Sequence, residues 1–352
     1  MNKLSLGIVG LPNVGKSTLF KAITNNPVNI ANYPFCTIDP NIGVVSVPDE
    51  RLEKLNELSK SKKKVPAVVE FYDIAGLVRG ANKGEGLGNQ FLSHIRETNA
   101  IVEVLRCFKS AEIIHVENSV DPIRDMEIIN AELALKDLDT VEKVLKSLEA
   151  EARSGKKDAQ KDLEVAKKAH ERLLKGELLV DLRHEPIIKK LQLLTAKPQV
   201  YLLNGSPEDV PAGLVEKIKA LGADYTIINL GDPSTGASTE LSRMSSGLNQ
   251  LIQKCYSVLD LISFFTTGED ETRAWTIVKG EKAPQASGTI HTDFEKSFIR
   301  AETISWNKLL ELAHSTGSGQ ATWSKAKQKG QIRSEGKEYT VQDGDVIEVK
   351  HG

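Results

Sequence analysis

The sequence has 352 residues, of which 40% are hydrophobic and 27% are charged, a composition typical of a globular protein with two or three domains. Its formal net charge of -2 excludes a globally basic nucleic-acid-binding protein, although basic faces can exist locally. Three cysteines, Cys36, Cys107 and Cys255, lie far apart, which argues against a disulfide scaffold and a zinc site. No apolar stretch approaches the roughly 18 residues of a membrane span, so we expect a cytoplasmic protein with no membrane partner.

A phosphate-binding loop is predicted at residues 10–18, where Gly-Leu-Pro-Asn-Val-Gly-Lys-Ser-Thr fits the pattern G-x-x-x-x-G-K-[ST]. Residues 4–9 are typical of a buried strand and residues 17–24 of a helix, which disfavours the alternative of an ordinary glycine turn. In such a loop the lysine neutralises phosphate charge and the next hydroxyl ligates Mg²⁺. The residues that we expect to bind nucleotide here are Asn13, Val14, Gly15, Lys16, Ser17 and Thr18.

Two further segments have the pattern of nucleotide switches. Thr37 precedes an alternating strand at 41–47 and is a candidate to close over Mg²⁺ and the γ-phosphate. Asp73 follows a strand at 68–72, and Gly76 completes a D-x-x-G motif whose backbone N–H can approach the γ-phosphate. We therefore expect Ser17, Thr37 and Asp73 to ligate Mg²⁺. The glycine-rich stretch 76–88 is interpreted as the second switch, with a flexible surface loop as the alternative.

The residue after Gly76 is Leu77, where proteins of the Ras type have the glutamine that orients the attacking water. Because leucine cannot polarise water, hydrolysis needs another group. His94 and His115 are the nearby imidazoles that could serve as the base, although most such histidines are structural.

Beyond the switches, residues 100–106 are predicted to form a strand, with 113–116 as its sequel. Apolar residues then recur every three or four positions between 126 and 148, and a second helical run follows at 158–175, which together predict an antiparallel helical hairpin. Its modest basic excess is compatible with a solvated face or with a surface that contacts phosphate backbone.

Strand pattern returns at 198–203, so the helical region is interpreted as an insertion into one α/β domain. Asn204, Gly205 and Ser206 follow at the carboxyl end of that strand, where ligands of parallel sheets bind, and we expect Asn204 to contact the purine. A last strand at 225–230 and a helix at 241–259 complete this domain.

The segment from about residue 268 is predicted to be a small β-rich module. It includes a strand at 275–278 and a hairpin of 338–341 with 346–349 around an Asp-Gly turn. His291, Asp293 and Glu295 are a conceivable metal site, but a structural role in loop packing is favoured over it.

With these motifs in hand, the chain resembles the YchF subfamily of Obg-related P-loop NTPases over essentially its whole length. The resemblance rests on the strings at 10–18, 35–41, 73–81, 84–92, 274–277 and 288–296. It implies an α/β fold: a P-loop GTPase-like doubly wound sheet, an inserted helical coiled-coil hairpin and a C-terminal β-grasp (TGS) domain. We place the G domain at 1–122 and 196–267, the insertion at 123–195 and the TGS domain at 268–352.

The resemblance also implies ATP as substrate, in preference to GTP, because members of the family have N-x-x-E where GTPases have N-K-x-D. An aspartate accepts two N–H bonds from guanine, which adenine cannot supply. This chain departs from both patterns, since Pro207 stands where the family has glutamate and Glu208 follows one place later. Asp209 lies two places too far along to read guanine unless the loop bulges.

The family's proposed catalytic histidine corresponds to His115, which with Lys16 and Gly76 forms the expected catalytic set. Asn13 matches the asparagine that helps related NTPases hold K⁺. The resemblance implies binding to the large ribosomal subunit, with rRNA or tRNA as further contacts of the coiled coil and the TGS domain. The oligomeric state is left open, with a monomer as the default for this architecture. The alternatives are a GTPase of conventional specificity and an adaptor that binds nucleotide with negligible turnover.

Overall fold

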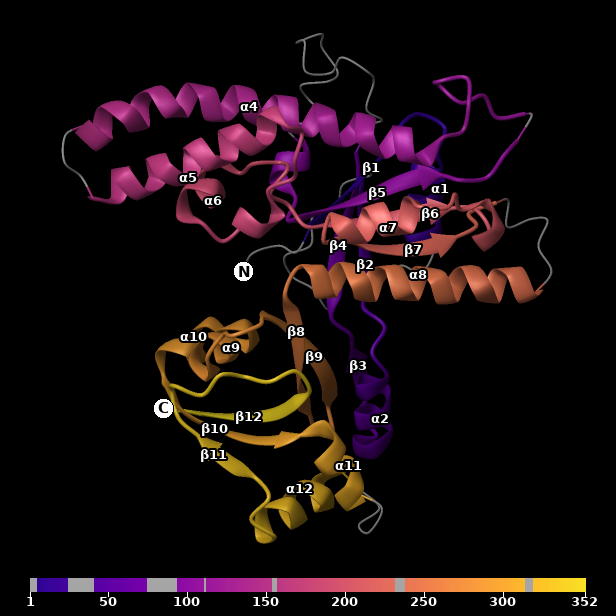
Figure 1. The fold of residues 1–352 in the computed structure, drawn as a ribbon. Helices are drawn as coiled ribbons and strands as arrows, with labels where there is room; N and C mark the ends of the chain where they lie inside the picture. Colours follow the sequence, from indigo (N-terminus) through magenta and orange to yellow (C-terminus); the bar gives the residue numbers. More distant parts are fainter. Residues whose placement is uncertain are drawn as a thin grey trace.

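The computed structural model describes residues 5–24, 41–74, 94–110, 112–153, 157–231, 238–313 and 319–352. Two six-stranded sheets organise these residues, with a long helical hairpin beside the first sheet and short helices around the second (Figure 1).

The first sheet carries the expected α/β domain. Its strand order is β2-β4-β1-β5-β6-β7, and every strand runs parallel to its neighbour except β2 beside β4. Strands β1, β5 and β6 are buried along their whole length, as expected for parallel strands covered on both faces. The bounds are β1 (Ser5–Val9), β2 (Ile42–Ser46), β4 (Val68–Asp73), β5 (Ala100–Arg106), β6 (Gln199–Asn204) and β7 (Asp224–Ile228).

Strand β1 lies between β4 and β5. The strands that follow β1 are added first on one side of it and then, from β5 on, on the other side, so the order of connection reverses beside β1. Ligands of such sheets bind at this reversal, outside the carboxyl ends of the strands. The helix that leaves this point is α1 (Lys16–Thr24), and α7 (Leu214–Ala220) and α8 (Ser238–Val258) accompany the last two strands. The strand-loop-helix context predicted around residues 10–18 is therefore confirmed.

The helical insertion folds as α4 (Pro122–Arg153) packed against α5 (Lys157–Leu174), followed by the 3-10 turn η3 (Val180–Leu182) and α6 (Pro186–Leu191). It has its own apolar core, made by residues such as Val141, Ala166 and Leu173. A buried carboxylate fastens its base: Asp137 accepts hydrogen bonds from Leu194 N (3.0 Å), Thr195 N (2.7 Å) and Thr195 Oγ (2.7 Å). The predicted antiparallel hairpin is confirmed.

The second sheet has the order β11-β10-β12-β8-β9-β3, with β12 parallel to β8 at its centre. This order agrees with the β-grasp expectation. Its strands are β8 (Leu261–Thr267), β9 (Glu271–Val278), β10 (Phe298–Ser305), β11 (Arg333–Glu335) and β12 (Asp345–His351). Its helices are α9 (Ala283–Ile290), α10 (Thr292–Lys296), α11 (Trp306–Ala313) and α12 (Gly319–Gln328). Because β8 pairs with β9 along its length, we propose that the C-terminal domain begins at β8.

The hairpin predicted around the Asp-Gly turn is wrong. Gly344 does occupy a left-handed turn position at φ 90°, but residues 338–341 form no strand there. Asp345 instead accepts hydrogen bonds from Tyr339 Oη (2.6 Å) and Gln342 N (2.9 Å), which folds this stretch back on itself. Strand β12 pairs with the distant strands β10 and β8, which the local turn motif does not indicate.

An unexpected crossing joins the two sheets. Between β2 and β4 of the first sheet the chain forms α2 (Glu50–Ser59) and β3 (Lys63–Val65), and β3 adds to the edge of the second sheet beside β9. Figure 1 shows α2 and β3 extending alongside the C-terminal strands. Arg51 on α2 lies 2.8 Å from Asp343, and Leu52 and Leu55 belong to an apolar core that both sheets share.

Candidate functional site

The phosphate loop is closed tightly by its second glycine. Gly15 has φ 110°, and a Cβ placed there would lie 2.4 Å from Asn204 Nδ2. Any larger residue would therefore be strained in its backbone and would displace Asn204. Val14 is buried, whereas Asn13, Ser17 and Thr18 are exposed around the rim of the loop.

Lys16 occupies the interior of this loop. Its ammonium donates to Leu11 O at 2.8 Å, and burial lowers the pKa of Lys16 to about 8, although the charge of Asp73 opposes the shift. Burial raises the pKa of Asp73 in turn, while Lys16 lowers it. The ammonium of Lys16 is therefore a positive charge with little solvent around it, which would attract a phosphate strongly.

The residues around the loop fit a magnesium ion. Ser17 is exposed in the first turn of α1, and Asp73 ends β4 in register with Ile8 of β1, so a hydroxyl and a carboxylate come from adjacent elements. Oxygen donors of this kind, completed by phosphate and water, are those that Mg²⁺ prefers. The other expected contributors, Thr37 and Gly76, lie outside the described residues.

The alternative metal site in the C-terminal domain finds no support. Within the described part of the chain there is no group of three or more His, Cys, Asp or Glu side chains that could hold a metal ion. His291 instead caps α10, where its Nδ1 accepts a hydrogen bond from Asp293 N at 3.2 Å. The structural role favoured for His291 agrees with this contact.

Asn204 braces the loop rather than standing free to meet a base. Its Nδ2 donates to Val14 O (2.8 Å) and its Oδ1 accepts from Leu230 N (3.0 Å). The second hydrogen of Nδ2 and the second lone pair of Oδ1 are left for a purine. Asn204 therefore ties the phosphate loop to the segment after β7, and its expected contact with the purine stays a prediction.

The segment after Asn204 uses one acidic residue to cap its own turn. Residues Pro207–Asp209 form the short 3-10 turn η4, and Asp209 Oδ2 accepts a hydrogen bond from Ser206 N at 2.9 Å. Gly205 N donates to Ile228 O at 3.1 Å, which holds the start of this turn against β7. Glu208 is exposed. The one aspartate near the expected guanine-reading position is thus occupied with capping its own turn.

His115 lies in a loop, and the prediction of a strand at 113–116 is wrong. The imidazole is buried, with Nε2 2.8 Å from Asp125 Oδ2 and Nδ1 accepting from Glu117 N at 3.2 Å. Both long edges of β5 are already paired, with β1 and β6, so this segment has no sheet edge to join. The other candidate, His94, is exposed.

The loop of His115 nevertheless touches the phosphate loop. Asn13 Nδ2 donates to Ile114 O at 3.2 Å, next to His115 in the chain. Sequence reasoning missed Asp125, the partner of His115, because an acid in the first turn of a helix has an ordinary explanation in the helix dipole. It also missed Glu103 on β5, whose pKa burial and then the charge of Asp125 raise well above its ordinary value.

Two family models match parts of this chain. Residues 5–142 match a family model described as a 50S ribosome-binding GTPase, and residues 261–352 match the YchF-GTPase C-terminal model, described as a protein of unknown function. A curated protein of Bacillus subtilis, "Ribosome-binding ATPase YchF", is 48% identical, with 99% of each chain covered. The chain belongs to the YchF family.

Other YchF proteins agree along the whole chain. The Escherichia coli O157:H7 protein of the same name is 45% identical, with 97% of each chain covered. A solved structure titled "Structure of the Schizosaccharomyces pombe YchF GTPase" superposes with a TM-score of 0.81 at 40% identity, covering 99% of this chain and 98% of that chain. The likeness therefore includes both sheets and the helical hairpin.

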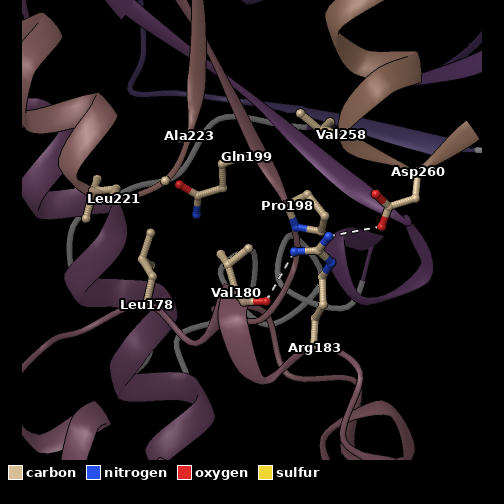
Figure 2. A pocket seen from close by; sticks show the side chains of 10 residues that line it. Leu178, Val180, Arg183, Pro198, Gln199, Leu221, Ala223, Val258 and Asp260 are labelled. Carbon is tan, nitrogen blue, oxygen red and sulfur yellow. Dashed lines mark hydrogen bonds and ion pairs between the residues drawn. The ribbon is translucent and has the colours of Figure 1, made fainter.

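In this YchF chain a separate cavity of about 120 Å³ lies at the opposite edge of the first sheet, where β6 and β7 begin (Figure 2). Its charged lining residues, Arg183 and Asp260, pair with each other at 3.0 Å, and the rest of the lining is largely aliphatic. Because Arg183 is already paired with Asp260, this lining gives no reason to place nucleotide phosphates here. Among the described helices, none combines the length and apolar character that crossing a membrane requires.

Proposed function

We propose that this chain binds and hydrolyses ATP, in preference to GTP, as a cytoplasmic partner of the ribosome. The closed phosphate loop with buried Lys16 supports nucleotide binding, and the curated relatives named "Ribosome-binding ATPase YchF" support ATP and the ribosome. The family model described as a 50S ribosome-binding GTPase supports the large subunit as the partner.

The observation that carries the preference for ATP is the hydrogen bond from Ser206 N to Asp209. Recognition of guanine needs a carboxylate that accepts from the N1–H and the exocyclic amine, and here that carboxylate is engaged at 2.9 Å within its own turn. Adenine presents no such pair of donors, so the engaged carboxylate costs it no hydrogen bond.

The proposed division of labour follows from position. Lys16 neutralises charge on the transferred phosphoryl group, while Ser17 and Asp73, joined by Thr37, hold Mg²⁺, and Gly76 supplies a backbone N–H. When bound, the metal screens the negative charge of the phosphates. His115 is the proposed group that orients or deprotonates the attacking water, in place of the glutamine that Leu77 replaces.

Equilibrium titration with fluorescent ATP and GTP analogues tests the preference. We expect tighter binding of ATP, and an affinity for GTP tenfold or more above that for ATP would refute the proposal. Repeating hydrolysis in K⁺ and in Na⁺ tests Asn13 as part of a potassium site, for which a faster rate in K⁺ is expected.

Turnover with and without 50S subunits tests the catalytic and partner assignments. We expect ribosomes to stimulate ATP hydrolysis and His115→Ala to abolish that stimulation, whereas His184→Ala, at an exposed position between η3 and α6, leaves it intact. Stimulated hydrolysis that persists in His115→Ala would remove His115 from the mechanism. Sedimentation of the chain with 50S subunits, and its mass alone in solution, check ribosome association and the proposed monomer.

A further inference from the structure

In the observed arrangement the imidazole of His115 is buried against protein groups. Its side chain is 3% exposed and that of Asp125 is 1% exposed, so the pair is sealed from solvent. Both ring nitrogens face protein atoms: Nε2 lies 2.8 Å from Asp125 Oδ2 as a close ion-pair contact, and Nδ1 accepts from the backbone N–H of Glu117. An imidazole bound in this way has no free nitrogen with which to accept a proton from water.

The carboxylate that holds His115 is itself firmly placed. Arg124 Nη2 lies 2.9 Å from the other oxygen of Asp125, and the same guanidinium donates to Ser119 Oγ (2.8 Å) and Ser119 O (2.7 Å). Asp121 caps this first turn of α4 by accepting from Arg124 N at 3.1 Å. The loop 112–121 is therefore fastened to the start of α4 through Asp125.

Apolar burial does not explain this loop conformation. Ile113, Ile114 and Val116 are 43%, 75% and 48% exposed, while the polar histidine between them is buried. A loop governed by the hydrophobic effect would present the opposite pattern. The polar contacts of Asp125 are thus the interactions that keep His115 inside.

This loop conformation also contacts the phosphate loop. Asn13 donates a hydrogen bond to the carbonyl oxygen of Ile114, which precedes His115 in the chain. We propose that Asp125 is a positioning residue that latches His115 away from the nucleotide and thereby suppresses hydrolysis until loop 112–121 is displaced. The inference rests on the proposed function of His115 and adds a regulatory state to the same site.

Two substitutions test the latch in the full-length protein. Asp125→Ala removes the contacts of this side chain with His115 and with Arg124. Asp125→Asn removes the carboxylate charge at unchanged volume. Asp121→Asn is the matched control, because it changes a charge on the same helical turn, exposed and without contact to His115. The readouts are carbethoxylation of His115 by diethyl pyrocarbonate, followed by peptide mass spectrometry, and ATP hydrolysis without ribosomes.

We expect Asp125→Ala to raise both the modification rate of His115 and the basal hydrolysis rate by at least about fivefold, as a shift in a two-state population would. The rise in hydrolysis should disappear in the double variant with His115→Ala, and Asp121→Asn should match the unchanged protein. If Asp125→Ala does not fold, Asp125→Asn decides by the same two readouts, with rises in the same direction.

Basal hydrolysis that is unchanged or lower in a folded Asp125 variant would overturn the latch, as would unchanged modification of His115. Those results leave the proposed function standing if His115→Ala still abolishes ribosome-stimulated hydrolysis. If His115→Ala has no effect on stimulated hydrolysis, the proposed function of His115 fails first, and the latch fails with it.

Discussion

Replacing Asn204 by alanine measures how much the nucleotide site depends on its internal brace. The substitution leaves Val14 O and the buried Leu230 N without their partners, at 2.8 and 3.0 Å in the intact protein. Each buried polar group left unpaired costs about 1–3 kcal/mol, so two groups cost roughly 2–6 kcal/mol of local stability. If the nucleotide must restore the loop on binding, affinity falls by about 30-fold or more.

The direction of that loss distinguishes a brace from a reader of the base. A brace serves both nucleotides, so we expect the dissociation constants for ATP and GTP analogues to rise by the same factor. Asn204→Asp is the control, because it keeps an oxygen for Leu230 N but sets a second oxygen against Val14 O. It should restore hydrogen-exchange protection at Leu230 without restoring nucleotide affinity.

The reasoning fails if Asn204→Ala weakens ATP and leaves GTP unchanged, since the side chain would then read the base. It also fails if both affinities stay within about twofold of the original value, which corresponds to less than about 0.5 kcal/mol.

Three other predictions concern charged groups. Because folding lowers the pKa of Lys16 from 10.5 to about 8, the unfolded chain holds this proton to higher pH than the folded chain does. The free energy of unfolding should therefore rise between pH 8 and 10.5, while the affinity for ATP falls as Lys16 loses its charge. Lys16→Met should abolish both trends, as measured by unfolding and by nucleotide titration at several pH values. Asp137→Ala should cost about 3 kcal/mol in urea unfolding because three buried donors lose their acceptor. Arg51→Ala should destabilise by about 1–2 kcal/mol through lost contacts to Asp343, whereas Lys62→Ala, from a fully exposed pair, should leave the unfolding transition unchanged by the same measurement.

The sequence predicted the first sheet well because its strands are continuous apolar runs and its phosphate loop is a low-degeneracy string. Lys16 and Ser17 lie where the motif requires them. The first turn of α1 buries Lys16 and leaves Ser17 exposed. The role of Asn204 was less predictable, since both of its partners, Val14 and Leu230, come from other segments of the chain. Hydrogen bonds of that kind leave no periodic signal in a sequence.

Two errors share a cause. At residues 113–116 the apolar run suggested a strand, and at 338–341 the Asp-Gly turn suggested a hairpin, yet both segments are held by polar contacts with a carboxylate further along the chain. Asp125 pairs with His115, and Asp345 accepts hydrogen bonds from Tyr339 Oη and Gln342 N. Periodicity describes which side chains suit a sheet, but tertiary polar contacts decide whether a sheet edge is reached.

The passage of α2 and β3 into the second sheet has a consequence for dissecting this protein. A fragment that begins at Leu261 would lack its outermost strand and would expose the edge of β9, and the remaining chain would carry Leu52 and Leu55 without their cover. In the intact protein that outer strand bears Lys63 and Lys64, and lysines on an edge strand discourage pairing with other chains. The segment formed by α2 and β3 therefore also protects the C-terminal domain from aggregation. A fragment cut at the apparent domain boundary would expose an unpaired strand edge to other chains.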